Sequence, residues 1–240
     1  MKNVIHFYIT DHCSTSCPFC GMTSGPLNNR FIDVKKISQI LDLTVSSSCA
    51  NVVRMIGGEP LAHPKFEELL KIFVMDTRID EVEIITNGIG LDKKLPFISE
   101  MSKTYGKRIL VRLSINYWLL SVNSLLKKTE IEKITADYKN FRNLKFSANI
   151  GIRVLPEDEK MLAEWRELLD SLRWGISIVH LAAYIPGSEK KCPGLRPYRK
   201  MICPHLDVTE FFVSPDGNIF HNCDEVAKNM QMNSKYYGKR

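Results

Sequence analysis

The chain has 240 residues, of which 44% are hydrophobic and 25% charged, and a formal net charge of +6 at pH 7. This composition is typical of a globular protein with one main domain and a small appendage, and the modest charge indicates a mildly basic, solvated surface. The apolar run at residues 1–9 is short and broken by His6, which excludes a signal peptide or membrane span. We therefore expect a cytoplasmic protein without a membrane partner.

Strand-like and helix-like segments alternate from residue 3 onward. Residues 3–9 are rich in β-branched and aromatic side chains and predict a first buried strand, which a loop follows to residue 29. Asp33 offers an N-cap for a helix with apolar residues at helical spacing. The order then repeats, with predicted strands at residues 51–56, 82–86, 108–115, 145–154 and 176–184. The predicted helices lie at residues 64–75, near 95–105, from the fourth strand to about 138, and at 157–172.

Six such strand–helix units imply a parallel sheet with helices on its outer face, because each is near the roughly 30-residue length of a βαβ repeat. A closed barrel of the usual kind needs eight units. The count therefore predicts an α/β fold built as an open, partial (β/α)6 TIM-like barrel over residues 1–185. Residues 186–240 are predicted to form a small extension. Functional groups in such sheets collect at the C-terminal ends of the strands.

The loop after the first strand contains Cys13, Cys17 and Cys20 in the pattern Cys-x3-Cys-x2-Cys. The chain has seven cysteines and no export signal, which argues against disulfides because the cytosol keeps thiols reduced. The pair Cys17 and Cys20 alone would fit a zinc knuckle or a redox dithiol. Zinc and a [4Fe–4S] cluster each normally take four protein ligands, so three thiolates leave one position for another ligand.

With Cys13 included, the loop resembles the cluster loop of the radical S-adenosylmethionine (radical SAM) superfamily. The resemblance implies a [4Fe–4S] cluster held by the three cysteines at three irons, with SAM on the fourth and Phe19 against the adenine. One electron then cleaves SAM to methionine and a 5′-deoxyadenosyl radical, which removes a hydrogen atom from the substrate. An electron donor such as flavodoxin or ferredoxin is the implied partner.

Two further strand ends carry motifs of the same family. Residues 57–60, Gly-Gly-Glu-Pro, let a backbone approach a ligand closely and resemble the motif that holds the amino group of SAM. Residues 86–88 resemble the family's Thr-Asn-Gly. Each stretch alone is also an ordinary turn.

Polar residues end the next two predicted strands. Ser114 and Asn116 are two residues apart, so their side chains face the same way, and the resemblance implies contacts with the SAM ribose or carboxylate. Arg153 would pair with the SAM carboxylate, although it is equally an ordinary surface arginine. His180 lies among apolar residues and is predicted to be a core histidine, and Cys49 a small buried or half-buried side chain. The SAM contacts implied by the resemblance are Phe19, Gly57, Gly58, Glu59, Pro60, Thr86, Asn87, Ser114, Asn116 and Arg153.

The alternation stops after residue 184, where prolines and glycines mark irregular chain. Residues 210–214 and 218–221 predict a hairpin around a Pro-Asp-Gly turn. The segment resembles the start of the SPASM/twitch extension of radical SAM enzymes, although the spacing before its last cysteine is one residue longer and a later Cys-x2-Cys pair is missing. It implies an auxiliary [4Fe–4S] cluster; a zinc site or unbound thiols are the alternatives. The candidate ligands are Cys192, Cys203 and Cys223, with a fourth position open to substrate or filled by His205, His221 or Asp224.

We predict a radical SAM enzyme that oxidises, crosslinks or otherwise modifies a peptide or small metabolite. The predicted barrel begins at residue 3, so an N-terminal leader-peptide-binding domain is not expected. One alternative is an epimerase in which Cys223 or Cys192 donates hydrogen when it is not a cluster ligand. A second is an RNA-modifying enzyme, to which the scattered lysines give little support, so no nucleic-acid partner is expected. A third, a non-catalytic zinc or electron-transfer module, leaves residues 57–60 unexplained.

Overall fold

The computed structural model describes residues 2–119, 141–184, 188–197 and 208–233. These residues form a twisted sheet of eight strands in the order β10-β9-β1-β2-β3-β4-β5-β6. All neighbouring pairs are parallel except β9 with β10. The strands are β1 (Lys2–Tyr8), β2 (Ala50–Ile56), β3 (Glu81–Thr86), β4 (Arg108–Asn116), β5 (Lys145–Ile152), β6 (Gly175–His180), β9 (Val208–Val213) and β10 (Ile219–Phe220).

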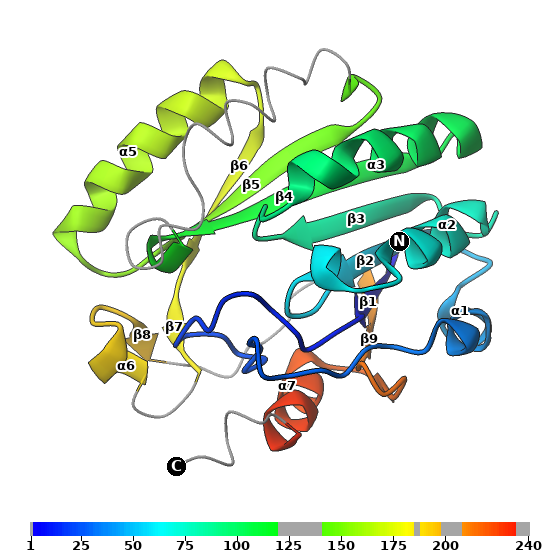
Figure 1. Ribbon diagram of the computed structural model, residues 1–240, viewed down its shortest axis with the longest axis horizontal. Helices are drawn as coiled ribbons and strands as arrows, with labels where there is room; N and C mark the ends of the chain where they lie inside the picture. Colours follow the sequence, from blue (N-terminus) through cyan, green and yellow to red (C-terminus); the bar gives the residue numbers. More distant parts are fainter. Residues whose placement is uncertain (1, 120–140, 185–187, 198–207, 234–240) are drawn as a thin grey trace.

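Four helices cover the outer face of this sheet, whereas the cysteine loop and the C-terminal helix α7 (Cys223–Met232) lie on its other side (Figure 1). Strand side chains alternate between the two faces, so Ile5 and Phe7 point toward the helices and join the main hydrophobic core. The Phe7 ring packs against Phe73 with centroids 4.8 Å apart. The covering helices are α1 (Ile37–Thr44), α2 (Phe66–Met75), α3 (Leu91–Tyr105) and α5 (Pro156–Ser171). The predicted α/β partial barrel is therefore confirmed.

The predicted helix starts and ends differ from the structure in a few places. Asp33 caps a short 3-10 turn, Val34–Lys36, that precedes α1, and its carboxylate accepts a hydrogen bond from the Lys35 amide at 3.0 Å. Helix α3 begins at Leu91, after Gly90 at φ +76°. Most of the predicted helix that follows β4 lies outside the described residues.

The last predicted strand is shorter than expected, and the prediction for His180 is wrong. Strand β6 ends at His180, and β7 (Ala182–Ala183) pairs instead with β8 (Arg196–Pro197) in a separate small sheet. His180 is exposed. Among the described strands β6 pairs only with β5, so Ile178 and Val179, at 40% and 44% exposure, are not enclosed.

The predicted C-terminal hairpin is present as β9 and β10, and it extends the barrel sheet. Strand β9 pairs in parallel with β1, from Lys2 opposite Val208 to Phe7 opposite Val213. Helix α7 (Cys223–Met232) follows, and its first turn is capped by the Asn222 side chain, which accepts from the Glu225 amide at 2.9 Å. The apolar residues of α7 pack on Tyr8 and Phe212, on the concave face of the sheet.

In the described ranges, no helix combines the length and the apolar character that crossing a bilayer requires.

Candidate functional site

A cavity of about 200 Å³ opens at the C-terminal ends of β1 to β4, where the sequence predicted the site. The loop after β1 forms one side of it, and the segments that end β2, β3 and β4 form the others. Ten of the predicted site residues meet here: Cys13, Cys17, Phe19, Cys20, Gly57, Gly58, Thr86, Asn87, Ser114 and Asn116. Sequence motifs separated by about a hundred residues thus converge on one cavity.

Cys13 is buried, and Cys17 and Cys20 are half-buried. Burial raises the pKa of Cys13 to about 11 and that of Cys17 to about 12. The Thr15 hydroxyl lies 3.1 Å from Cys13 Sγ and 3.7 Å from Cys17 Sγ. Thiolates at Cys13 and Cys17 are therefore unfavourable until a cation offsets the loss of hydration. Among the described residues, no three Cys, His, Asp or Glu side chains are arranged so that they could hold one metal ion.

The donor set nevertheless fits the cluster that the sequence implies. Three cysteines line one cavity, and a [4Fe–4S] cluster uses such thiolates at separate irons. The Ser24 hydroxyl also lines the cavity and is buried without a hydrogen-bond partner in the described part of the chain. A buried hydroxyl without a partner is unfavourable, so Ser24 indicates space for a polar ligand; the sequence analysis did not single it out.

Gly57 and Gly58 hold the cysteine loop against the end of β2. The Gly58 amide donates to Thr10 O at 2.7 Å, and the Glu59 amide donates to His12 O at 2.8 Å. A Cβ on Gly57 would lie 2.3 Å from Thr10 O, and one on Gly58 would lie 2.1 Å from His12 O. The glycines are therefore required for backbone contact next to Cys13.

Glu59 and Pro60 lie outside the cavity lining, so their predicted contact with SAM stays a prediction. The buried Glu59 carboxylate accepts hydrogen bonds from the Thr86 hydroxyl at 2.7 Å, the Asn87 amide at 2.7 Å and the Leu61 amide at 3.0 Å. It thereby joins the ends of β2 and β3. Burial outweighs these hydrogen bonds and raises the pKa of Glu59 from 4.5 to about 7.

This raised pKa predicts a pH-dependent stability. Native Glu59 binds its proton more tightly than the unfolded chain does, so its contribution to stability is largest below pH 4.5 and is lost as the pH rises through 7. Glu59→Gln cannot titrate. Between about pH 5 and about pH 8 the wild type should lose up to about 3 kcal/mol relative to this variant. Urea unfolding of both proteins at the two pH values measures the difference, and a constant difference would contradict the assignment.

Asn87 reaches from the end of β3 to the cysteine loop. Its amide Nδ2 lies 3.8 Å from Cys13 Sγ, and its Oδ1 accepts from the Ile89 amide at 2.9 Å. Ser114 and Asn116 line the cavity from β4, on one face of the strand as their spacing predicts. Asn116 Oδ1 also accepts from the Leu119 amide at 3.1 Å.

Arg153 lies outside this cavity, and neighbouring groups already engage its guanidinium. Arg153 Nη2 lies 2.9 Å from Asp158 Oδ1 and 3.2 Å from Glu157 Oε1. The guanidinium carbon sits 3.6 Å from the centre of the Tyr117 ring. Its predicted role toward SAM is untested, but it would require exchange of the buried Asp158 partner.

The C-terminal cysteines occupy two different environments. Cys192 is buried and lies close enough to Arg153 for that guanidinium to favour its thiolate, although burial raises its pKa overall. Cys223 is buried at the start of α7 with Tyr8 and Phe212. Of the candidate fourth ligands, His221 is exposed and Asp224 is half-buried. Cys203 and His205 lie outside the described residues.

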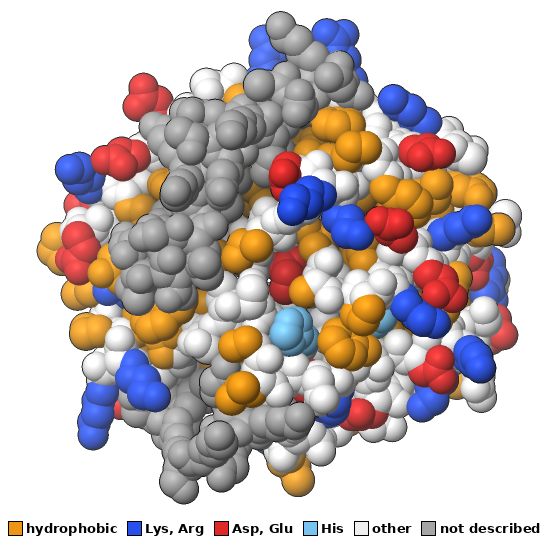
Figure 2. Space-filling view, in the orientation of Figure 1, with side chains coloured by type: hydrophobic (Ala, Val, Ile, Leu, Met, Phe, Trp, Pro, Cys, Tyr) orange, Lys and Arg blue, Asp and Glu red, His pale blue; other side chains and the backbone are white. Residues whose placement is uncertain are grey.

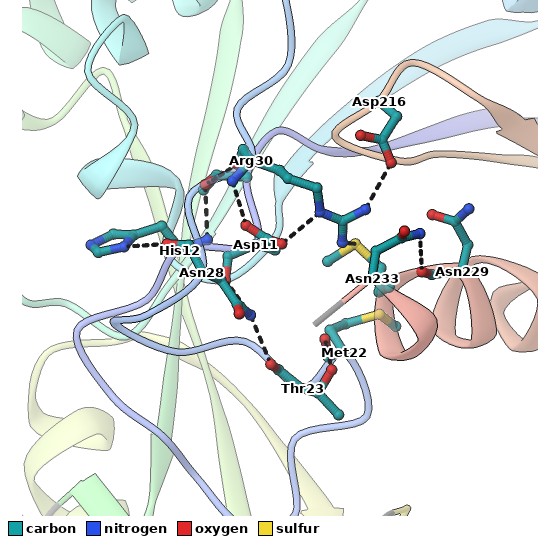
Figure 3. Close-up of polar contacts among 11 residues, drawn as sticks. Asp11, His12, Met22, Thr23, Asn28, Arg30, Asp216, Asn229 and Asn233 are labelled. Atoms are coloured by element: carbon teal, nitrogen blue, oxygen red, sulfur yellow. Dashed lines mark hydrogen bonds and ion pairs between the residues drawn. The ribbon is translucent and has the colours of Figure 1, made fainter. Parts of the chain in front are cut away.

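Arg30 connects the cysteine loop to the C-terminal segments, a link that the sequence analysis missed (Figure 3). Its Nε lies 2.7 Å from buried Asp11, two residues before Cys13, and its Nη1 lies 2.7 Å from Asp216 in the β9–β10 turn. Its Nη2 also contacts Met230 Sδ of α7 at 3.8 Å. Asp216 is 186 positions from Arg30, so no local sequence signal could have revealed the contact.

Arg30→Met is expected to destabilise the protein by about 3 kcal/mol, because it leaves the Asp11 carboxylate buried without its charged partner. Arg78→Met is the matched control. Arg78 also joins two aspartates, Asp42 and Asp76, but it is 44% exposed and should contribute about 1 kcal/mol or less. Urea unfolding compares the variants, and equal losses would contradict this role of Arg30.

The chain matches the family described as the radical SAM superfamily over residues 7–169. It is 32% identical over 96 residues to the GTP 3′,8-cyclase of Chlorobaculum tepidum, which is 40% of this chain and 29% of that protein. It is 24% identical over 156 residues to the GTP 3′,8-cyclase of Clostridium botulinum strain Hall, which is 63% of this chain and 45% of that protein. The chain thus spans less than half the length of these curated relatives.

Solved structures share the fold. Streptococcus suis SuiB bound to its precursor peptide SuiA superposes with a TM-score of 0.65 at 14% identity, covering 98% of this chain and 66% of that one. Native anSMEcpe with bound AdoMet and the Cp18Cys peptide gives a TM-score of 0.61 at 12% identity, covering 99% and 81%. The family match covers more than half of the chain and includes all three loop cysteines, so the chain belongs to the radical SAM superfamily of enzymes.

Proposed function

We propose that this chain binds a [4Fe–4S] cluster on Cys13, Cys17 and Cys20, binds SAM in the adjoining cavity, and removes a hydrogen atom from a peptide or small-metabolite substrate. The observation that carries the proposal is the single cavity lined by three thiols, two glycines and polar side chains at strand ends. When bound, the cluster and SAM supply one-electron reductive cleavage of SAM and the abstraction of hydrogen.

Residues around the cysteines prepare this site. The Thr15 hydroxyl and the Asn87 amide are near enough to donate to cysteine sulfurs, which stabilises thiolates. Glu59 fixes the Asn87 backbone, and Gly58 fixes the loop next to Cys13. The Cys13 thiol is buried, which shields this ligand from water.

The cavity lining suggests how SAM is oriented. Ser114 and Asn116 project from β4 into the cavity, so we assign them to the SAM ribose or carboxylate. Arg153 is the weaker candidate for the carboxylate, because its guanidinium already pairs with Asp158. Phe19 lines the cavity beside Cys20, as expected for a ring that stacks on adenine.

The role of Cys192, Cys203 and Cys223 has two candidate answers. An auxiliary cluster would accept an electron or bind substrate, which leads to oxidation or crosslinking. A hydrogen-donor cysteine, Cys223 or Cys192, would instead lead to epimerisation. The different neighbours of Cys192 and Cys223 favour neither answer. The iron content of a chain that lacks the three loop cysteines separates them.

Several substrate classes fit the comparisons. SuiB and anSMEcpe are bound to peptides in their structures, which supports a peptide substrate, and the GTP 3′,8-cyclases support a small molecule. An RNA-modifying activity has less support: on the face shown in Figure 2, basic side chains are interspersed with acidic ones. The electron donor would be a protein such as flavodoxin or ferredoxin.

The direct test is SAM cleavage by the anaerobically reconstituted full chain with dithionite as reductant. We expect 5′-deoxyadenosine and methionine to form only when iron, SAM and reductant are all present. Cys49→Ala changes a half-buried thiol outside the cavity and should keep wild-type cleavage. If the reconstituted wild-type chain holds about four irons but does not cleave SAM, the proposal is overturned.

A further inference from the structure

A row of charged side chains crosses the concave face of the sheet below the cavity. Glu83 of β3 is buried and lies between two arginines from the flanking strands. Its Oε2 accepts from Arg54 Nε at 2.6 Å, and its Oε1 accepts from Arg112 Nε. His6 of β1 lies opposite Arg54 of β2, and its Nε2 is 3.1 Å from Oε1 of Glu210 on β9. Charged groups therefore occupy the centre of the concave face. The opposite face of the same strands, which the helices cover, carries the hydrophobic core.

The two arginines keep hydrogen-bond donors available. Each uses its Nε for Glu83, so one carboxylate serves two guanidinium groups. Arg112 Nη1 lies 3.3 Å from Asn149 Oδ1. The terminal nitrogens of Arg54 have no acceptor within the described residues. The two side chains remain 31% and 23% exposed, so an incoming group can reach them.

The row lies directly beneath the cavity. Arg54 is two residues before Ile56, and Arg112 is two residues before Ser114. Ile56 and Ser114 both line the cavity, and residues two apart on a strand point to the same face. Two residues of strand span about 7 Å. A molecule anchored at the arginines would therefore place atoms roughly 7 Å away at the cavity.

A purely structural row is a poor explanation for this arrangement. Burying Glu83 with two arginines carries a desolvation penalty that apolar residues of similar volume avoid. Guanidinium forks held in place by a buried carboxylate are instead suited to bidentate recognition of carboxylate or phosphate. We propose that Arg54 and Arg112 bind an anionic group, carboxylate or phosphate, of the substrate, and that Glu83 positions them. This inference rests on the proposed function, because it places the reacting end of that substrate in the cavity.

The test measures anion binding by titration calorimetry on the reconstituted full chain with SAM bound and without reductant. Bound SAM keeps the probes off the open iron. Pyrophosphate stands for a substrate with a phosphate group and malonate for one with a carboxylate group. The probe that binds more tightly shows which of the two groups the arginines recognise. Arg54→Met and Arg112→Met should each weaken the preferred probe by about tenfold or more. Should either variant fail to fold, the corresponding Lys variant keeps the charge but loses the fork, and should weaken binding several-fold.

Two further variants separate binding from structure, a control at Arg108 and a variant of the positioning residue Glu83. Arg108→Met removes another Arg–Glu pair between β3 and β4, with Glu81 at 2.7 Å, but Arg108 is 62% exposed; anion affinity should be unchanged. Glu83→Gln keeps both guanidinium groups but loses one of the two carboxylate oxygens that position them, so it should bind the probe less tightly than the wild type and have a lower thermal midpoint. Equal affinity in the wild type and both arginine variants, or no saturable binding by the wild type, would overturn the inference. Adding reductant afterwards reports SAM cleavage in the same samples, so the proposed function and this inference can fail separately.

Discussion

Replacing Cys13, Cys17 and Cys20 together by Ala is expected to abolish reductive SAM cleavage and to remove about four irons from the reconstituted chain. The three thiols line the same cavity, and no other Cys, His, Asp or Glu is among its described lining residues. The loop would then have no thiolate ligand left to hold iron. Iron and sulfide analysis measures the loss, and 5′-deoxyadenosine formation measures the activity.

The iron that remains reports on the C-terminal cysteines. About eight irons in the wild type and about four in the triple variant would establish an auxiliary cluster. About four irons in the wild type and none in the triple variant would leave Cys192 and Cys223 as thiols and favour the hydrogen-donor role. Unchanged iron and unchanged SAM cleavage in the triple variant would contradict the assignment of the cysteine loop.

Gly58→Ala is expected to destabilise the fold by about 3 kcal/mol and to lower the iron content several-fold. The added Cβ would lie 2.1 Å from His12 O and 2.5 Å from His12 C, which are backbone atoms next to Cys13. Backbone cannot move aside as a flexible side chain can, so the cysteine loop itself must shift. Urea unfolding and iron analysis measure the two effects.

Gly175→Ala at the start of β6 is the matched control. There the nearest atom to the added Cβ is Ser147 Cβ at 3.7 Å, an ordinary van der Waals contact. This variant should unfold and bind iron as the wild type does. If both alanine variants behave alike, the close packing of Gly58 is not what holds the loop.

Local sequence patterns predicted most of the barrel because each strand and helix carries its own periodicity. The cavity was predictable for a related reason: parallel strands bring their C-terminal ends to one edge, so the loop at Cys13 and the glycines at residues 57–58 had to meet. The direction of individual side chains was not predictable. Glu59 belongs to a binding motif by sequence, yet its carboxylate points to Thr86 and Asn87.

Contacts between distant parts of the chain were missed. Arg30 with Asp216, and Glu83 with its two arginines, depend on strand order and register, which no periodicity encodes. The error at His180 has a similar origin. A largely apolar segment such as residues 176–179 can form either a central strand or an edge strand. Whether it is enclosed depends on the strands and helices packed beside it, and β6 lies at the edge of the sheet.

The parallel pairing of β9 with β1 also has a consequence for how the protein is made. Strand β1 leads into the cysteine loop, but its second neighbour lies about two hundred residues later in the chain. Closing so long a loop is slow compared with forming local pairs. Until β9 has left the ribosome, the edge beside the cysteine loop stays unpaired, and strands of two nascent chains can join there before the site is complete.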